Sequence, residues 1–210
     1  MKPFKLQHTI HGDNQKADDL RTLEDSLEEI LKNKLKGKAQ LNTLNLACGR
    51  ADETGVLASI LGKKADSVKL HGLDLRENEI QNAKSLWEDK ISKIASEVEC
   101  SFSAGKGDDF ESWKDFEDPD LIFIRHQNYW FDHKAWVKLY DQALHKLNKD
   151  GYIVITSYFD KEHEMARNVL ESLGAVEVEH RFNPNSRVIG DSPKITKSVD
   201  RHISIFLKAE

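Results

Sequence analysis

Apolar residues between positions 14 and 36 recur at intervals of three and four. On this spacing one face of a helix carries six of them: Leu20, Leu23, Leu27, Ile30, Leu31 and Leu35. Charged residues fill most of the other positions. The pattern predicts an amphipathic helix over residues 14–36, ended by Gly37, and residues 41–47 then form an apolar run of strand length.

Helical and strand-like stretches alternate after this first strand. Further strands are predicted over residues 67–75, 98–102, 121–124 and 152–156, and helices over residues 55–61, 80–91, 133–147 and 162–173. Thr54 is the expected cap of the first of these helices. Two last strand-like stretches, residues 175–182 and 202–207, have no helix between them and predict an antiparallel hairpin at one edge of the sheet.

Strands separated by helices pair in parallel through right-handed crossovers. We therefore expect an α/β fold, a three-layer αβα sandwich whose seven-stranded, mostly parallel sheet has a reversed edge strand. No linker divides the chain, which predicts a single domain over residues 1–210, with an N-terminal arm and helix in 1–40 and the sheet core in 41–207. The arm over residues 1–16 and the loop over residues 183–200 are long enough to act as lids.

Composition narrows the functional class. The 210 residues are 39% hydrophobic and 32% charged, and no apolar run approaches the roughly 18 residues that span a bilayer. The formal net charge of −5 argues against a nucleic-acid partner. Cys48 and Cys100 match no paired spacing, and the N-terminus lacks the apolar region of a secretion signal. These features predict a cytoplasmic protein without membrane contact; the oligomeric state stays open.

Candidate binding residues follow the predicted strands, because ligands of open α/β sheets bind at the carboxyl ends of strands. Small residues at 47, 49 and 51 let the backbone turn sharply after the first strand, and Gly49 is the tightest point. Asp74 ends the next strand 25 residues later, close to the roughly 20 expected for a carboxylate that binds ribose hydroxyls. Alternatively, Asp74 caps the following helix, and Asp108 or Asp109 caps a helix beginning near Phe110.

Taken in order, five segments resemble the motifs of class I S-adenosylmethionine-dependent methyltransferases. They are residues 45–51, 72–75, 107–110, 120–126 and 144–155, so the resemblance runs over most of the chain, from about residue 41 to 207. The last segment is similar to the family's stretch that precedes the fifth strand, with Asp150 in place of a proline or glycine. The family also implies a seven-stranded sheet with a reversed edge strand.

The resemblance implies a role for each matched residue near the cofactor. Ala47 and Gly49, with Cys48 between them, would lie under the methionine part of S-adenosylmethionine, and Asp74 would hold both ribose hydroxyls. Asn45 stands where the family has an acidic residue near the cofactor's amino-acid end. A carboxylate suits the ribose because it accepts two hydrogen bonds with equal strength.

The same resemblance implies the adenine site and the region of methyl transfer. Leu75 would flank the adenine, Asp108 or Asp109 would accept from its amino group, and Phe110 would lie beside the ring. Arg125 would follow the fourth strand near the sulfonium and the methyl acceptor.

His126 would lie beside Arg125 and is the candidate general base, since an imidazole pKa near 6.5 suits proton removal near neutrality. Alternatively, His126 only shapes the floor of the pocket, because positioning alone accelerates methyl displacement. Tyr129, Trp130 and Tyr158 follow the fourth and fifth strands and either wall an acceptor pocket or belong to the core.

Departures from the family pattern keep two alternatives open. The family's loop usually has an acidic residue followed by three glycines at alternate positions; Asn45, Ala47 and Ala51 replace three of these four, and Gly49 alone matches. A non-catalytic protein that keeps the fold and binds S-adenosylhomocysteine is one alternative. A nicotinamide-binding Rossmann protein is the other, although Asp52 occupies the position of its third glycine.

Other chemistry finds little support in the sequence. The histidines lack the spacing of a zinc site, and the stretch around Lys63 lacks the glycine and hydroxyl residue of a phosphate-binding loop, so no metal is expected. The sequence therefore predicts an S-adenosylmethionine-dependent methyltransferase that acts on a small or medium-sized acceptor.

Overall fold

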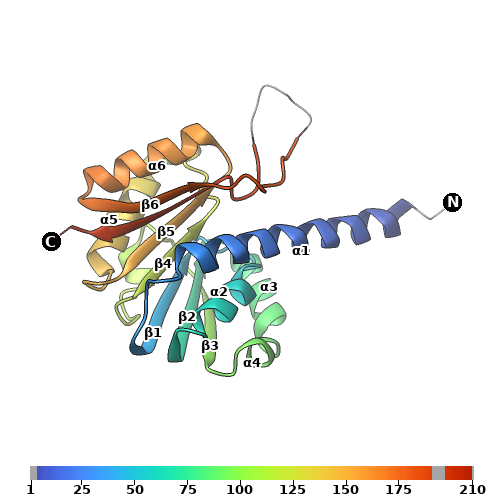
Figure 1. The fold of residues 1–210 in the computed structure, drawn as a ribbon, viewed down its shortest axis with the longest axis horizontal. Coiled ribbons are helices and arrows are strands. Elements are labelled where there is room, and N and C mark those ends of the chain that lie inside the picture. Colours follow the sequence, from blue (N-terminus) through green and yellow to red (C-terminus); the bar gives the residue numbers. More distant parts are fainter. Residues whose placement is uncertain (1–3, 191–196, 210) are drawn as a thin grey trace.

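A computed structural model describes residues 4–190 and 197–209, and Figure 1 shows its fold. The described residues form a seven-stranded sheet of order β3-β2-β1-β4-β5-β7-β6. The strands are β1 (Lys38–Leu46), β2 (Ala65–Asp74), β3 (Val98–Ala104), β4 (Leu121–Arg125), β5 (Tyr152–Ser157), β6 (Ala175–Phe182) and β7 (His202–Lys208). Strand β7 is antiparallel to both β5 and β6, whereas the other pairs are parallel. The expected reversed strand is therefore confirmed.

Helices cover both faces of the sheet (Figure 1). One face packs against α1 (Phe4–Ile30), α2 (Thr54–Leu61), α3 (Glu77–Trp87) and the short α4 (Ile91–Ile94), in a core that includes Leu23, Leu57 and Phe123. The other face packs against α5 (His133–Lys146) and α6 (Asp160–Ser172), around Ile124 and Tyr140. The three-layer αβα sandwich is confirmed. Strands buried on both faces explain the continuous apolar run in β4.

Helix α1 differs from its prediction at both ends. It begins at Phe4, so the predicted arm is helical from that residue, and residues 1–3 lie outside the described range. It ends at Ile30, where the Lys34 ammonium donates to the Ile30 carbonyl at 2.7 Å, and the Lys64 ammonium donates to the Leu31 carbonyl at 2.7 Å. Lysines that bond the last carbonyls satisfy a helix end that the apolar spacing alone did not locate.

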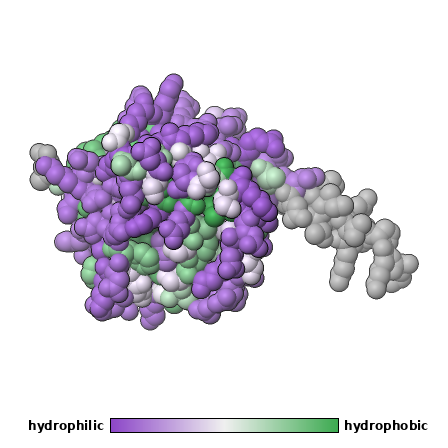
Figure 2. Space-filling model, turned by 90° about the horizontal axis from the view of Figure 1, so that it is seen from below, coloured by the Kyte–Doolittle hydropathy of each residue, from purple (hydrophilic) through white to green (hydrophobic). Residues whose placement is uncertain are grey.

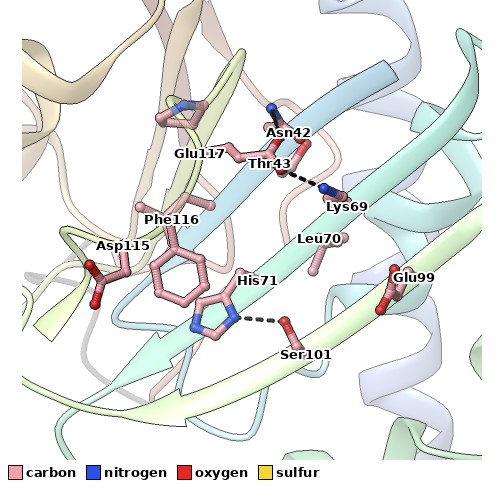
Figure 3. Close-up of a pocket in the computed structure, with 12 residues that line it drawn as sticks. Asn42, Thr43, Lys69, Leu70, His71, Glu99, Ser101, Asp115, Phe116 and Glu117 are labelled. Carbon is pink, nitrogen blue, oxygen red and sulfur yellow. Dashed lines mark hydrogen bonds and ion pairs between the residues drawn. The ribbon is translucent and has the colours of Figure 1, made fainter. Parts of the chain in front are cut away.

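The β3–β4 connection contains no α-helix, although one alternative interpretation of Asp108 and Asp109 predicts a helix near Phe110. Only one 3₁₀ turn, η1 (Phe110–Ser112), forms there, so loop residues rather than a helix cover the adjoining face of β2 and β3. A pocket of about 220 Å³ lies on this face, and in Figure 3 the Phe116 ring lies over the ring of His71. Their centroids are 3.6 Å apart.

His71 is a structural residue in this pocket. Its two ring nitrogens each lie 2.8 Å from a serine hydroxyl, those of Ser101 and Ser103, and burial lowers its pKa to about 4. The imidazole is therefore neutral near pH 7. The pocket opens beside the middle of the strands rather than at their carboxyl ends, so it is not the candidate site.

Polar side chains cover most of the face shown in Figure 2, with smaller apolar patches between them. Helix α1 is long enough to span a bilayer but too polar for it, and no other helix in the described ranges combines the required length and apolarity.

Trp87 anchors the loop between β1 and α2. Its indole Nε1 donates to the Ala51 carbonyl at 2.8 Å, and a methyl group at Gly55 would come within 2.8 Å of the ring. The expected cap of α2 is wrong: Glu53 precedes the helix without a side-chain capping bond, and Thr54 is its first residue. The position of the loop thus depends on a tertiary contact.

We expect Trp87→Phe to destabilise the protein, because it removes one of the two donors to the Ala51 carbonyl and leaves the Thr54 N–H, at 3.0 Å, as the other. The free energy of unfolding should fall by about 1 kcal/mol in urea titrations followed by circular dichroism. Trp130→Phe is the matched control, since Trp130 is half exposed. A loss from Trp87→Phe no larger than that of the control would contradict this role.

Candidate active site

A cavity of about 430 Å³ opens at the carboxyl ends of β1, β4 and β5. Six of the predicted site residues line it: Ala47, Cys48 and Gly49 from the loop after β1, Arg125 and His126 at the end of β4, and Tyr158 after β5. The structure therefore brings together residues that lie up to about 110 positions apart, as expected for strand ends that meet at one sheet edge.

The loop after β1 adopts a left-handed backbone at alternate positions. The φ angle is 55° at Ala47, 55° at Gly49 and 53° at Ala51. Such angles favour glycine, so the alanines keep a turn suited to glycine at some energetic cost. A Cβ at Gly49 would lie 3.0 Å from the Arg76 guanidinium, the end of a flexible side chain that can shift, so the backbone angle rather than space favours glycine here.

Asp74 lies directly behind this loop and fixes it. One carboxylate oxygen accepts from the Gly49 N–H at 2.7 Å, and the other accepts from the Arg76 N–H at 2.9 Å and its Nε at 3.0 Å. The Asp74 side chain is buried, whereas that of Arg76 is 56% exposed. The Asp74 carboxylate therefore holds both the loop after β1 and the start of α3, and the exposed Arg76 side chain covers its solvent-facing side.

A buried ion pair joins β4 to the segment that leads into β7. The Arg125 guanidinium donates to both carboxylate oxygens of Asp200, at 3.0 and 2.6 Å, and lies 3.5 Å from Glu53. Burial opposes both charges, but the attraction between Arg125 and Asp200 raises the pKa of the guanidinium and lowers that of the carboxyl. Asp200 also accepts from the Thr156 hydroxyl at 2.8 Å. Both groups are charged at neutral pH.

His126 is held on two sides. Its Nε2 lies 2.8 Å from Asp200 Oδ1 and 3.1 Å from the Asp200 amide nitrogen, and its ring stacks on Tyr158 with centroids 3.7 Å apart. The φ angle of His126 is 55°, a strained value for a non-glycine residue. The Asp200 backbone N–H donates to Nε2, so Nε2 is the ring nitrogen that accepts a hydrogen bond here.

Helix α1 and the loop after β6 form the roof of the cavity. Arg187 makes a bidentate pair with Asp19 at 2.9 and 2.6 Å, and Lys16 pairs with Asp52 of the loop after β1. These residues line the cavity. Of the two predicted lids, the arm contributes Gln15 and Lys16 to the cavity lining, and the loop contributes Arg187, Ile189 and Val199; residues 191–196 fall outside the described range.

Several predicted site residues lie elsewhere. Leu75 and Phe110 are exposed, and neither lines the cavity. Asp109 precedes η1 and accepts from the Glu111 N–H at 3.3 Å, which is the capping role considered above. The Asp108 backbone carbonyl accepts from Gln142 on α5 at 3.2 Å.

The two aromatic residues after β4 also lie away from the cavity. Tyr129 is completely buried and packs beside Tyr140, so it belongs to the core rather than to a pocket wall. Trp130 is half exposed, with the Lys161 ammonium 5.8 Å from the centre of its ring. Of the three predicted acceptor residues, Tyr158 alone lines the cavity.

Glu162, near the start of α6, is a buried carboxyl that the sequence pattern did not reveal. Its Oε1 accepts from the Tyr129 N–H at 3.4 Å, and its Oε2 has no hydrogen-bond partner among the described residues. Burial raises its pKa to about 7. Its position in the first turn of a helix made it look like an ordinary surface acid.

Three histidines from distant positions also meet on the far side of α6. Ligand atoms of His163, His180 and His202 lie within 4.8 Å of one another. However, His163 Nδ1 lies 2.9 Å from the Ser157 hydroxyl and Nε2 lies 2.8 Å from the Ser204 hydroxyl. Both of its ring nitrogens are engaged, so the arrangement is that of a hydrogen-bonded cluster.

Comparisons with known proteins show which family the sequence matches and which solved structures share the fold. A sequence profile described as a methyltransferase domain matches residues 37–198. The fold is similar to an S-adenosylmethionine-dependent methyltransferase from Clostridium acetobutylicum, with a TM-score of 0.68, 12% identity and 100% of both chains covered. No curated protein sequence matches the chain significantly.

Two further solved structures share the fold. The N-methyltransferase NodS from Bradyrhizobium japonicum has a TM-score of 0.56 and 18% identity over 95% of this chain and 97% of its own. Precorrin-6y C5,15-methyltransferase from Geobacter metallireducens has a TM-score of 0.61 and 14% identity over 93% of this chain and 87% of its own.

The chain belongs to the methyltransferase-domain family, whose profile matches most of its length. This confirms the expected class, an S-adenosylmethionine-dependent methyltransferase, and favours it over the nicotinamide-binding alternative.

We expect Ala47→Gly to stabilise the protein, since glycine relieves the left-handed backbone at φ 55°. The free energy of unfolding should rise by about 1 kcal/mol, measured in urea. Ala83→Gly, in the middle of α3, is the control and should lower it by a similar amount. Destabilisation by Ala47→Gly would show that packing of the methyl group outweighs the strain.

Glu162→Gln should change the pH dependence of stability. The pKa of this carboxyl rises from its ordinary 4.5 to about 7 on folding, so the folded state binds the proton more tightly. Its contribution to stability is full below pH 4.5 and is lost as the pH rises through about 7. The stability of Glu162→Gln relative to wild type should therefore increase between about pH 5 and 8, by roughly 3 kcal/mol.

Glu164→Gln, an exposed substitution on the same helix, is the control and should show no such trend. A Glu162→Gln curve that runs parallel to wild type from acid to neutral pH would contradict the raised pKa.

Proposed function

We propose that the cavity at the carboxyl ends of β1, β4 and β5 binds S-adenosylmethionine and a small or medium-sized methyl acceptor. The observation that carries this proposal is the loop after β1. Its backbone keeps left-handed angles at positions 47, 49 and 51 although two of these residues are alanines, and Asp74 bonds the Gly49 N–H from behind. A turn held against its own strain is typical of a ligand site.

The residues around the cavity fit the cofactor. Its volume of about 430 Å³ lies in the usual range for small-molecule sites. Gly49 leaves the loop without a side chain where a ligand approaches. The side chain of Arg76 is 56% exposed, so its guanidinium can move into solvent and leave the Asp74 carboxylate to the ribose hydroxyls.

When bound, S-adenosylmethionine supplies an electrophilic methyl group on a sulfonium. The residues of the chain position the two reactants and exclude water, and orientation alone accelerates such a displacement greatly. The His126 imidazole, in the cavity wall beside Tyr158, would take up the proton that the acceptor loses. The loop after β1 and Asp74 would hold S-adenosylmethionine, whose methyl group would pass from sulfur to the acceptor.

A small acceptor in the cytoplasm agrees with the charges of the chain. The net charge of −5 disfavours a nucleic acid as the acceptor. The cavity bordered by α1, the loop after β6 and Tyr158 has a volume of about 430 Å³, which suits a metabolite rather than a folded macromolecule. Residues 41–207 form the catalytic domain in this proposal, and the helix before them contributes part of the roof.

We expect Asp74→Ala to weaken binding of S-adenosylhomocysteine at least tenfold, about 1.4 kcal/mol, by isothermal titration calorimetry. Asp66→Ala is the control, because Asp66 is an exposed residue at the other end of the same strand and should leave the affinity unchanged. Equal affinities of Asp74→Ala and wild type would overturn the assignment of Asp74.

A thermal-shift comparison of S-adenosylmethionine, S-adenosylhomocysteine and NAD tests the cofactor itself. Ligand at 100 times its dissociation constant adds about 2.7 kcal/mol to stability. Stabilisation by NAD alone would contradict the proposal. Binding of S-adenosylmethionine without transfer of its labelled methyl group to any component of a metabolite extract would favour the non-catalytic alternative.

A further inference from the structure

Glu53 is the buried carboxylate that faces the cavity beside the loop after β1. It is 4% exposed and lines the cavity, whereas Asn45, eight residues earlier, is completely buried behind it and does not. The Asn45 side-chain amide donates from Nδ2 to Glu53 Oε1 at 2.6 Å. The negative charge at this end of the cavity therefore sits on Glu53, and Asn45 orients it.

The second oxygen of Glu53 is only weakly engaged. Its partner among the described residues is the Arg125 guanidinium at 3.5 Å, which already makes two shorter bonds to Asp200. In addition, Asn45 Oδ1 is buried without a hydrogen-bond partner among the described residues. Oxygen atoms of Glu53 and Asn45 therefore remain able to accept hydrogen bonds from a cation next to the loop.

A carboxylate and a guanidinium 3.5 Å apart match one kind of ligand end particularly well. An α-amino acid carries its ammonium and its carboxylate on the same carbon, so its two charges face two neighbouring groups of opposite sign. The methionine part of S-adenosylmethionine is such a zwitterion. A charge-assisted hydrogen bond to each group gives both affinity and orientation.

We propose that Glu53 binds the α-ammonium group of the cofactor's methionine part, with Asn45 as its positioning residue and Arg125 on the side of the α-carboxylate. This inference rests on the proposed function, that the cavity binds S-adenosylmethionine. It assigns to Glu53 the charge that is missing at position 45. In this chain the amide stands at position 45 and the carboxylate at position 53, whereas the family usually has its carboxylate at position 45.

Calorimetry with two ligands tests the assignment on the full chain. S-Adenosylhomocysteine carries the amino-acid end, whereas 5′-methylthioadenosine keeps the adenosine and the thioether but lacks it. Glu53→Gln should weaken binding of S-adenosylhomocysteine at least tenfold and leave binding of 5′-methylthioadenosine within about twofold, because only the first ligand has an ammonium. Asp66→Asn, at an exposed carboxylate far from the cavity at the start of β2, is the control and should affect both ligands little.

A charge exchange gives a second, independent measurement. Asn45→Asp alone places two carboxylates in contact and should lower the melting temperature, since like charges repel. Combining Asn45→Asp with Glu53→Gln restores one amide and one carboxylate in the opposite order. The double variant should bind S-adenosylhomocysteine at least threefold more tightly than Glu53→Gln alone.

The outcomes separate this inference from the function beneath it. Wild type that binds neither ligand overturns the proposed function. Wild type that binds both, with Glu53→Gln weakening both equally or neither, overturns the role of Glu53 and leaves the function standing. Should Glu53→Gln fail to fold, Glu53→Asp carries the test: a selective loss of S-adenosylhomocysteine supports the assignment, and an equal or absent loss refutes it.

Discussion

The buried ion pair between Arg125 and Asp200 is the interaction on which the site depends. It joins the end of β4 to Asp200, two residues before β7, and through Glu53 and Asn45 it reaches the end of β1. Two charges removed from water stay together only when their hydrogen bonds are well made. Here Thr156 and His126 supply the remaining partners of Asp200, so the network fixes three strand ends and the imidazole at once.

The loop after β1 shows how a family's conformation persists when its residues change. Alanine at positions 47 and 51 keeps the left-handed angles, because Trp87 holds the Ala51 carbonyl and Asp74 holds the Gly49 amide. The strain lies in the backbone of the loop itself, whereas the hydrogen bonds that hold the loop come from Trp87 of α3 and Asp74 of β2. A sequence motif with one glycine out of three is therefore compatible with the backbone that the motif normally specifies.

Much of the fold follows from the sequence because alternation and helical spacing are local signals. The strand order places the ends of β1 and β4 side by side, so Gly49, Arg125 and His126 could be assigned to one edge in advance. Glu53, Asp200 and Glu162 could not, because their roles depend on burial and on partners far away in the chain. Asp200 lies 75 residues from Arg125. Tyr129 was misassigned for a related reason, since an aromatic residue after a strand points equally well into a core or a pocket.

The antiparallel pairing of β7 with β5 has a consequence for the order of folding. During synthesis β1 and β4 are complete long before residue 200 emerges, yet Arg125 has no bidentate partner until β7 inserts between β5 and β6. Contacts between distant residues form slowly because a long loop must first close. The insertion of one strand therefore completes the sheet and neutralises the buried arginine in a single event, which couples maturation of the site to the last step of sheet assembly.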